Sequence, residues 1–456
     1  MKFFLVILLT MTSLVSPSTA REMLTPDRPL ADDETLVSSG STFALGFFTP
    51  TNSTNRYLGM WFNKAPDRRI VWVANRASPI VNSTGLLSIA PNGTMMITDQ
   101  KSKRIVWTVG NISGSAVPAA QLLDSGNFVL KRDADNSTSR YAWQSFDHPT
   151  DTLLAGMKLG LDWTTGLSVV ITAWKSHDDP SEGEYYVEMN TDTDIYLHSS
   201  SGTVWRSGPS DGINLRNAGL NYTFVNNSQE STFSFEANDR PTILAASPGG
   251  KVQLLAFSLD SQRWDLLWEE PATECDIVGH CGPNGICDIE SSTVCSCLQG
   301  YVPRNPGKWA SADWTDGCVR NTNFDCRNGT DGFVTVARTK LPEFSTPTTR
   351  ATSLDECRLA CLRNCACTAY AIDGGQYGCV IWLTDSLSNA VRINDFQQDL
   401  YVRVASSYLV SPVQPRKRKH KKLIILVCLP LGVIILATVA CILLRRKTRK
   451  RGKMNI

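Results

Sequence analysis

Short apolar runs separated by polar turns make up residues 21–147. The runs are STFALGFF, RYLGMWF, RIVWVANR, GLLSIA, TMMITD, RIVWTV and NFVLK, with clusters of Pro, Gly, Asn, Asp and Ser between them. Runs of this length bounded by such residues are typical of β-strands, and no segment sustains a helical period. The pattern therefore predicts an all-β domain of many short hairpins, folded as a barrel, a sandwich or a prism.

Two segments of this region repeat one pattern. LLSIAPNGTMMITD and LLDSGNFVLKRD each have an apolar pair, a turn with Asn and Gly, an apolar strand and an acid. Repeats of this kind indicate a pseudo-symmetric assembly of sheets. Trp61, Trp72 and Trp107 lie within apolar runs, so we expect them to fill the core rather than to stack on a sugar.

Residues 148–270 keep the β pattern, with frequent aromatic residues and turns such as TTG, DDPSEG and SPGG. They are predicted to form a second β domain or an extension of the first. Asp192 and Asp194 stand in a turn-like stretch, and we interpret them as a solvated loop rather than as a catalytic carboxylate pair.

Cysteines divide the chain, because none precedes Cys275 and twelve lie from Cys275 to Cys379. Residues 275–318 carry the spacing Cys-x5-Cys-x5-Cys-x7-Cys-x-Cys-x20-Cys, which predicts a disulfide framework in a segment too short for a large core. Fifteen pairings are possible on paper. A zinc site is the competing interpretation, which an oxidising compartment disfavours. The other six cysteines accompany a helix predicted to begin at the capping box Ser353–Glu356.

Both ends of the chain carry targeting patterns. Residues 1–20 have a basic start, an apolar run and small residues before a cleavage point, and are predicted to be a signal peptide. Residues 423–444 contain no charge and as a helix would span roughly 33 Å, enough to cross a bilayer. We therefore expect a single-pass plasma-membrane protein with its N-terminus outside. Residues 405–422 are predicted to be an extended juxtamembrane linker, and 445–456 a basic cytoplasmic tail on anionic lipid.

Charge is unevenly distributed. Residues 416–453 hold 13 Lys and Arg and no acid, which leaves 32 basic and 43 acidic residues in the rest. An acidic exported portion disfavours nucleic-acid binding. Eight Asn-x-Ser/Thr sequons are predicted to carry glycans on exposed loops. They begin at Asn52, Asn82, Asn92, Asn111, Asn136, Asn221, Asn226 and Asn328.

Motifs for catalysis are missing from the sequence. It contains no Gly-rich phosphate loop, no catalytic His-Arg-Asp, no Asp-Phe-Gly and no Gly-x-Ser-x-Gly. The five histidines, at 148, 177, 198, 280 and 420, are scattered without a second ligand at suitable spacing. We therefore expect no catalytic residue, no metal site and no cofactor.

Several strings carry a family resemblance. FALGFF, YLGMWF, VWVANRASPI, LLDSGNFVL and WQSFDHPTDTLLAGMKLG resemble the bulb-type lectin domain of plant S-locus glycoproteins and S-domain receptor-like kinases. The resemblance implies a β-prism of three four-stranded sheets, and a sugar site with the pattern Gln-x-Asp-x-Asn-x-Val-x-Tyr. Here Asn127 and Val129 fit the pattern, whereas Leu123, Ser125 and Lys131 replace its Gln, Asp and Tyr. We interpret Asn127 first as a turn residue and second as a carbohydrate ligand.

The rest of the ectodomain resembles the same family. VWRSGPSDG is similar to its S-locus glycoprotein region, CGPNGIC with Cys-x-Cys to an EGF-like module, and SLDECRLACLRNCACTAY with GCVIW to a PAN/apple domain. These similarities imply domains at 21–147, 148–270, 271–320 and 326–404. The EGF-like resemblance implies the pairs Cys275–Cys287, Cys281–Cys295 and Cys297–Cys318. The PAN resemblance implies Cys357–Cys379 and Cys361–Cys367, which leaves Cys326 to pair with Cys365.

The expected fold is therefore mainly β, with two lectin-like domains, small disulfide-rich modules and one transmembrane helix. The family suggests cell recognition, such as recognition of pollen, through an extracellular peptide or glycan and through dimers with related receptors. Without a kinase the chain would act as a decoy or co-receptor. Two alternatives stay open, namely a truncated receptor serine/threonine kinase and a functional mannose-binding lectin.

Overall fold

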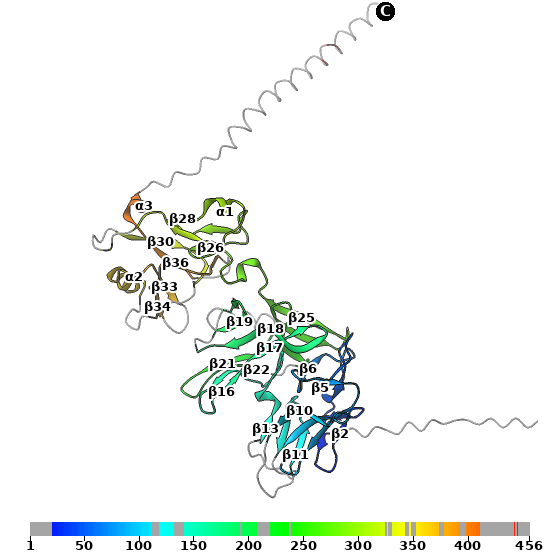
Figure 1. The fold of residues 1–456 in the computed structure, drawn as a ribbon. Coiled ribbons are helices and arrows are strands. Elements are labelled where there is room, and N and C mark those ends of the chain that lie inside the picture. Colours follow the sequence, from blue (N-terminus) through cyan, green and yellow to red (C-terminus); the bar gives the residue numbers. More distant parts are fainter. Residues whose placement is uncertain are drawn as a thin grey trace, which may run out of the picture.

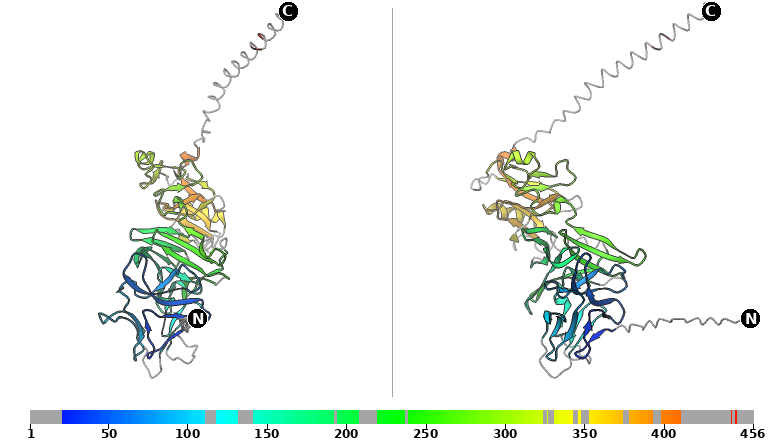
Figure 2. Two further views of the ribbon diagram at one scale, coloured as in Figure 1. Left: turned by 90° about the vertical axis from the view of Figure 1, so that its right-hand side faces the viewer. Right: turned by 45° about the vertical axis from the view of Figure 1, so that its right-hand side comes forward.

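The computed structural model describes residues 21–110, 118–131, 141–191, 194–207, 219–236, 239–323, 326, 331–342, 346–347, 353–373, 378–392, 398–410, 442 and 445. The predicted signal peptide, and all but one residue of the predicted membrane segment 423–444, lie outside these ranges. Among the helices that the ranges contain, none has the length and apolar character needed to cross a bilayer. Figures 1 and 2 show the described elements as three bodies in a row.

The first body is a prism of three sheets among the described residues. One has the order β3 (Thr35–Val37), β4 (Phe43–Phe48), β5 (Asn55–Phe62), β6 (Ile70–Val73), with β7 (Ile80–Val81) also paired to β5. The second runs β10 (Arg104–Val109), β9 (Met95–Asp99), β8 (Gly85–Ile89), β2 (Leu30–Ala31). The third runs β1 (Met23–Leu24), β11 (Ala119–Leu122), β12 (Phe128–Lys131), β13 (Trp143–Gln144). The mainly β prediction is confirmed.

The second body repeats this architecture within the part of the chain that is described. One sheet has the order β14 (Thr152–Leu154), β23 (Thr242–Ser247), β24 (Lys251–Ser258), β25 (Arg263–Glu270). The second runs β16 (Leu167–Val169), β15 (Leu159–Asp162), β22 (Glu230–Phe235), β21 (Tyr222–Asn226). The third runs β17 (Ile171–Ser176), β18 (Asp179–Met189), β19 (Ile195–Ser199), β20 (Gly202–Arg206). A short 3-10 turn, η1 (Ser145–Asp147), precedes it. Among its described residues, the second body thus has three four-stranded sheets of its own.

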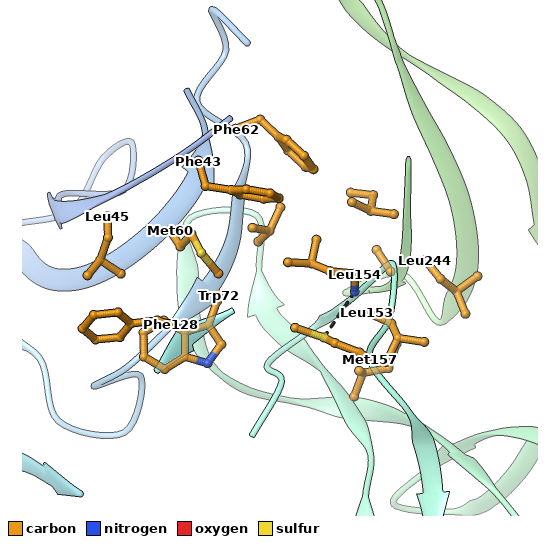
Figure 3. Close-up of a cluster of buried hydrophobic side chains, with 14 of the residues drawn as sticks. Phe43, Leu45, Met60, Phe62, Trp72, Phe128, Leu153, Leu154, Met157 and Leu244 are labelled. Atoms are coloured by element: carbon orange, nitrogen blue, oxygen red, sulfur yellow. Dashed lines mark hydrogen bonds between the residues drawn. The ribbon is translucent and has the colours of Figure 1, made fainter. Parts of the chain in front are cut away.

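One continuous hydrophobic core joins the two prisms. It runs from Leu24 in the first to Phe257 in the second. Figure 3 shows Phe43 and Phe62 of the first prism facing Leu154 of the second. Because apolar burial stabilises by about 25 cal/mol per Å², a shared core makes each prism depend on the other. The predicted boundary at 147/148 therefore lies inside a packed interface.

The sequence pattern explains the strands. In β8 and β9 every second residue is buried, as alternation of apolar and polar residues requires when one face meets the core. The tryptophan prediction is confirmed for Trp61 and Trp72, which are 7% and 2% exposed, while Trp107 is half-buried against the core. The ring centroids of Trp72 and Trp107 lie 6.2 Å apart in an edge-to-face pair.

A buried arginine fastens the prisms together. Arg76, from the VWVANR string of the first prism, is 9% exposed. Its guanidinium donates to the carbonyl oxygens of Pro180 (2.9 Å), Thr172 (3.1 Å), Ala173 (2.9 Å) and Ser181 (3.4 Å) in the second prism. Those carbonyls lie beside the point where the β17–β18 pairing shifts register around Trp174. The arginine thus supplies donors to backbone acceptors at an irregular part of the ladder.

The third body fuses the two disulfide-rich modules. The strand order β27 (Cys295–Cys297), β26 (Gly285–Cys287), β35 (Ala390–Arg392), β31 (Thr339–Lys340) draws its strands from both modules. Two other sheets are β28 (Tyr301–Pro303) with β29 (Cys318–Arg320), and β30 (Gly332–Val336), β36 (Leu400–Val404), β33 (Ala369–Asp373), β34 (Gly378–Trp382), β32 (Thr346–Pro347). The described helices here are η3 (Glu274–Asp276), α1 (Pro306–Ala310), α2 (Leu354–Arg363) and α3 (Ser406–Val410). Residues 271–320 and 326–404 therefore fold as one unit.

Helix α2 is capped at both ends. The predicted capping box is confirmed, since Ser353 and Glu356 exchange side-chain and backbone hydrogen bonds. At the other end Arg403 donates to the carbonyls of Asn364 (3.0 Å) and Cys367 (3.3 Å). Its charge is paired with Asp331 at 3.1 Å, and both side chains are 1% exposed. Because Arg403 belongs to β36, its hydrogen bonds tie the helix terminus to the five-stranded sheet of the third body.

Two local predictions are wrong. The linker from residue 405 was expected to be extended, but Ser406–Val410 form α3, whose Leu409 packs against Gly332 of β30. Asp194 was expected in a solvated loop, but it is 3% exposed and its carboxylate lies 3.1 Å from the guanidinium of Arg206. Antiparallel pairing of β19 with β20 brings the two side chains together. Asp192 lies outside the described residues.

That ion pair stands at the joint between the second and third bodies. Arg206 also donates to the carbonyl of Leu341 (3.2 Å), and Lys340 donates to the carbonyl of Arg206 (2.9 Å). Burial lowers the pKa of Lys340, and Arg206 lowers it further. Nearby, burial raises the pKa of Glu270 to about 7, with a further contribution from Asp276. The joint therefore contains charged groups that water screens poorly.

Replacing Arg76, which clamps the two prisms together, is expected to destabilise the prism pair. Arg76→Met keeps much of the side chain's volume but leaves several carbonyls without a donor. The free energy of unfolding should fall by on the order of 3 kcal/mol in chemical denaturation, since hydrogen bonds from a charged group and unpaired buried acceptors each contribute at this level. Arg263→Met, at an exposed position, is the control. Equal stability of the two variants would contradict the clamp.

Glu270 is expected to make the joint sensitive to pH. Its pKa is about 7 in the folded chain against an ordinary 4.5, so the folded state holds the proton more tightly. The stabilisation is therefore full below pH 4.5 and is lost as pH rises through about 7. In thermal unfolding between about pH 5 and about pH 8, the midpoint of the unmodified protein should fall more than that of Glu270→Gln. Glu269→Gln, one residue away, should keep the unmodified profile.

Candidate functional site

The side chain of Asn127, the candidate carbohydrate ligand in the sugar motif, is turned into the protein. It is 6% exposed, and its Nδ2 donates to Gln144 Oε1 at 2.9 Å. Its Oδ1 accepts from the hydroxyl of Ser145 (3.4 Å) and the backbone N–H of Phe146 (3.3 Å). Both ends of the amide are thus occupied by η1 and the residue before it. Asn127 acts in this geometry as a clamp on the segment that leads into the second prism.

The other positions of the motif are similarly engaged. Val129 is fully buried, and Lys131 Nζ donates to Gln121 Oε1 at 2.6 Å. Asp124, beside the turn, accepts from the backbone N–H of Gly40 at 2.8 Å, so it holds a neighbouring loop. A sugar site needs several free donors and acceptors that converge on hydroxyl groups. This end of the first prism does not present such a set among its described residues.

A cleft of about 820 Å³ lies between the two prisms and is the second candidate site. The first prism lines it with the loop before β3, the end of β4, and the loop between β5 and β6. The second prism lines it with the segment before β14, the end of β17, and parts of β23 and β24. Clefts between packed domains are common ligand sites because each wall can supply different chemistry.

One wall is charged and rigidly built. Arg56 pairs through its guanidinium with Asp32 and also reaches Thr49 Oγ1 at 3.4 Å. Asp32 in turn accepts from the backbone N–H of Gly85 at 3.0 Å. These contacts tie the loop before β3 to the turn after β4, so this wall does not depend on a ligand for its shape.

The floor of the cleft contains an arginine and a carboxylate from different prisms. Burial lowers the pKa of Arg69, and Asp151 and Asp67 oppose that shift. Burial raises the pKa of Asp151, and Arg69 and Arg76 oppose it. No ion pair within 4 Å joins Arg69 to any acid among the residues described, although its guanidinium carbon lies 5.9 Å from the ring centre of Trp264. A polar ligand could therefore bridge the two groups.

One aromatic ring from each prism forms a shelf in the cleft. The rings of Phe48 and Trp174 are stacked with centroids 6.5 Å apart, and both residues line the cleft. The Trp174 Nε1–H is buried and has no hydrogen-bond partner in the described part of the chain. A buried donor without a partner is uncommon and favours a ligand acceptor at this place.

The arrangement is suited to binding rather than to reaction. It offers an arginine, carboxylates, an indole N–H and flat rings, whereas no hydroxyl or thiol nucleophile paired with a histidine lines it among the described residues. Sequence reasoning missed all of these residues, because they come from separated loops. The only signal was charge within apolar strings, as in RRIVWV and HPTDTLL.

The other predicted site residues are distributed over the surface and the third body. Asn52, Asn82, Asn92, Asn221 and Asn226 are all exposed, whereas Asn111, Asn136 and Asn328 lie outside the described residues. The structure contains the five disulfides that the family resemblance implies, and the two remaining cysteines, Cys326 and Cys365, form the sixth. The six described disulfides are Cys275–Cys287, Cys281–Cys295, Cys297–Cys318, Cys326–Cys365, Cys357–Cys379 and Cys361–Cys367.

A cluster of sulfurs in the EGF-like segment has the appearance of a metal site. The Sγ atoms of Cys281, Cys287 and Cys295 lie within 4.8 Å of one another. Each is bonded to another cysteine, so none is a free thiolate. The proximity follows from two neighbouring disulfides.

Fold and site together define an extracellular-type protein with two bulb-lectin prisms and a disulfide-rich PAN unit. Profiles of known families match three stretches, namely the D-mannose binding lectin at 69–175, the S-locus glycoprotein domain at 201–305 and the PAN-like domain at 326–389. The S-locus-specific glycoprotein S6 of Brassica oleracea is 38% identical over 399 residues, covering 84% of this chain and 90% of that protein. The chain belongs to the family of S-locus glycoproteins and S-domain receptor kinases.

Longer relatives belong to the same family. The receptor-like serine/threonine-protein kinase SD1-8 of Arabidopsis thaliana is 37% identical over 441 residues, covering 93% of this chain and 51% of that protein. The chain thus spans about half the length of this kinase. A solved two-domain lectin from Scilla campanulata is 13% identical, and the match covers 56% of this chain and 89% of that one with a TM-score of 0.19.

The buried position of Asn127 predicts a structural phenotype. Asn127→Ala removes the acceptor of the Phe146 N–H and should lower the free energy of unfolding by about 1–3 kcal/mol in chemical denaturation. Asn63→Ala, at an exposed asparagine, should change it little. A mannose array probed with both variants is the second measurement. Loss of mannose binding in Asn127→Ala at unchanged stability would favour a working lectin site instead.

Proposed function

We propose that this S-domain ectodomain is a non-catalytic recognition protein, which binds an extracellular peptide or glycan in the cleft between its two prisms. The observation that carries the proposal is the set of unused groups in the cleft. The guanidinium of Arg69 has no ion-pair partner within 4 Å among the described residues, and the Trp174 N–H has no acceptor there. A ligand that accepts from the buried Trp174 N–H and pairs with the half-buried guanidinium of Arg69 would be stabilised by both contacts.

The chemistry of the walls favours a polar ligand with flat or extended parts. Arg69 can bind a carboxylate or a carbonyl, Asp151 can accept from hydroxyl or amide groups, and the Phe48–Trp174 shelf can pack on a sugar ring or a peptide side chain. The volume of about 820 Å³ suits a few sugar units or residues. Glycan and peptide are thus the two classes to be compared.

The PAN unit would supply the partner contact. Leu354 and Leu359 of α2 are 40% and 46% exposed, so this helix leaves apolar side chains open to solvent. Pairing through this surface with a second copy or a related receptor would let the ectodomain act as a decoy or co-receptor. At the plasma membrane, the same ectodomain would serve a receptor serine/threonine kinase, a role that the 37% identity with SD1-8 supports.

Cleft variants test the proposal. The purified ectodomain is applied to a glycan array and a peptide array, and hits are titrated against Arg69→Gln and Trp174→Phe. The first variant removes the guanidinium but keeps a polar side chain, and the second removes the indole N–H but keeps an aromatic ring. Each should weaken binding about tenfold or more, equivalent to about 1.4 kcal/mol. Arg263→Gln and Trp163→Phe are matched controls at exposed positions outside the cleft. Hits that bind all four variants as tightly as the unmodified ectodomain would place recognition elsewhere.

A further inference from the structure

A glycosylation sequon stands at the mouth of the cleft. Asn52 lies in the β4–β5 turn, which is closed by the Ser53 N–H donating to the Pro50 carbonyl at 3.3 Å. Its φ is 59°, a left-handed conformation that asparagine adopts more readily than most residues. Thr49, Pro50 and Thr51, immediately before it, line the cleft. The turn thus fixes the direction of the Asn52 side chain at the rim.

The opposite rim is the β17–β18 turn of the second prism. His177 and Asp178 are its central residues, since Ser176 pairs with Asp179, and His177 lines the cleft. The Nδ2 of Asn52 donates to Asp178 Oδ2 across the mouth at 3.5 Å. The atom that carries a glycan in Asn-linked glycosylation therefore lies between the two walls.

The two residues of the aromatic shelf lie close in sequence to the two turns that form the rim. Phe48 ends β4 four residues before Asn52, and Trp174 precedes His177 by three residues in β17. Trp174 also carries the buried N–H that lacks an acceptor among the described residues. Flat aromatic rings beside a polar donor are suited to a sugar with an N-acetyl group, which offers a carbonyl acceptor and an apolar ring face.

We propose that the glycan on Asn52 lies in the mouth of the cleft, with its inner N-acetylglucosamine units against the Phe48–Trp174 shelf, and that it controls access to the cleft. Attachment forms a bond between Nδ2 and C1 of the sugar. A lipid-linked pyrophosphate carrier leaves, and one amide proton is lost. The remaining Nδ2 hydrogen can keep the contact to Asp178. The control of access rests on the proposed function, whereas the position of the glycan does not.

Other described sequons do not share this geometry. Asn92 lies in the β8–β9 turn, where its Oδ1 accepts from the Thr94 N–H at 3.1 Å, and it does not line the cleft. A glycan there extends from the first prism without meeting the second. Asn92 therefore provides a matched control on the same prism.

The test compares variants that leave Asn52 itself in place. Thr54→Ala removes the sequon, Thr54→Ser keeps it, and Thr94→Ala removes the control sequon at Asn92. The secreted, full-length ectodomain of each is subjected to hydroxyl-radical footprinting with mass spectrometry, which also reports occupancy of Asn52. Oxidation of Trp174 and Phe48 should rise several-fold in Thr54→Ala and stay at the unmodified level in the other two.

Either of two results would overturn the proposal. One is an Asn52 that carries no glycan in the secreted protein, and the other is equal oxidation of Trp174 in all forms when Asn52 is fully occupied. Array binding separates this proposal from the proposed function. If Trp174 becomes exposed in Thr54→Ala but no array ligand is affected by Arg69→Gln, the glycan position stands and the ligand site fails. If Arg69→Gln weakens array binding but Thr54→Ala leaves it unchanged, only the control of access by the glycan is contradicted.

Discussion

The buried guanidinium of Arg76 is the interaction on which the arrangement of the two prisms depends. Burying its charge in the interface costs desolvation free energy. Four backbone carbonyls of the second prism, together with the nearby Asp151, offset that cost. A methionine could fill the space but could not satisfy the shifted ladder around Trp174. The clamp therefore fixes the register of one prism against the other, and the cleft beside it keeps its shape because of that register.

The same logic recurs wherever the bodies meet. Between the second and third bodies, Arg206 donates to the carbonyl of Leu341 and Lys340 donates to the carbonyl of Arg206, while Asp194 pairs with the Arg206 guanidinium. Inside the third body, Arg403 serves one helix end and one acid. Each joint places a long cationic side chain on backbone carbonyls of its partner. Such joints specify one orientation, because the fork of donors fits only one set of acceptors.

The sequence predicted the elements better than their connections. Alternating apolar runs correctly indicated a mainly β chain, and the Ser353 capping box correctly located a helix. The shared core, the mixed sheet of β26 with β35 and the burial of Asp194 could not be read from local patterns, because each depends on residues far apart in sequence. The cleft escaped prediction for the same reason. Its lining residues come from strand ends and loops that are far apart in sequence.

Residues of the lectin motif stabilise the fold in this chain, whereas the cleft between the prisms offers a separate place for a ligand. In this chain Asn127 holds η1 and Lys131 donates a hydrogen bond to Gln121, so these two polar residues of the motif stabilise the fold. A β-prism whose own end has become structural can still recognise ligands where it meets a second prism. There the two walls bring an arginine, a carboxylate and a stacked aromatic pair from different loops into one space. Substitutions in those loops change the ligand chemistry without touching the core, whereas the clamp beside them holds the geometry constant.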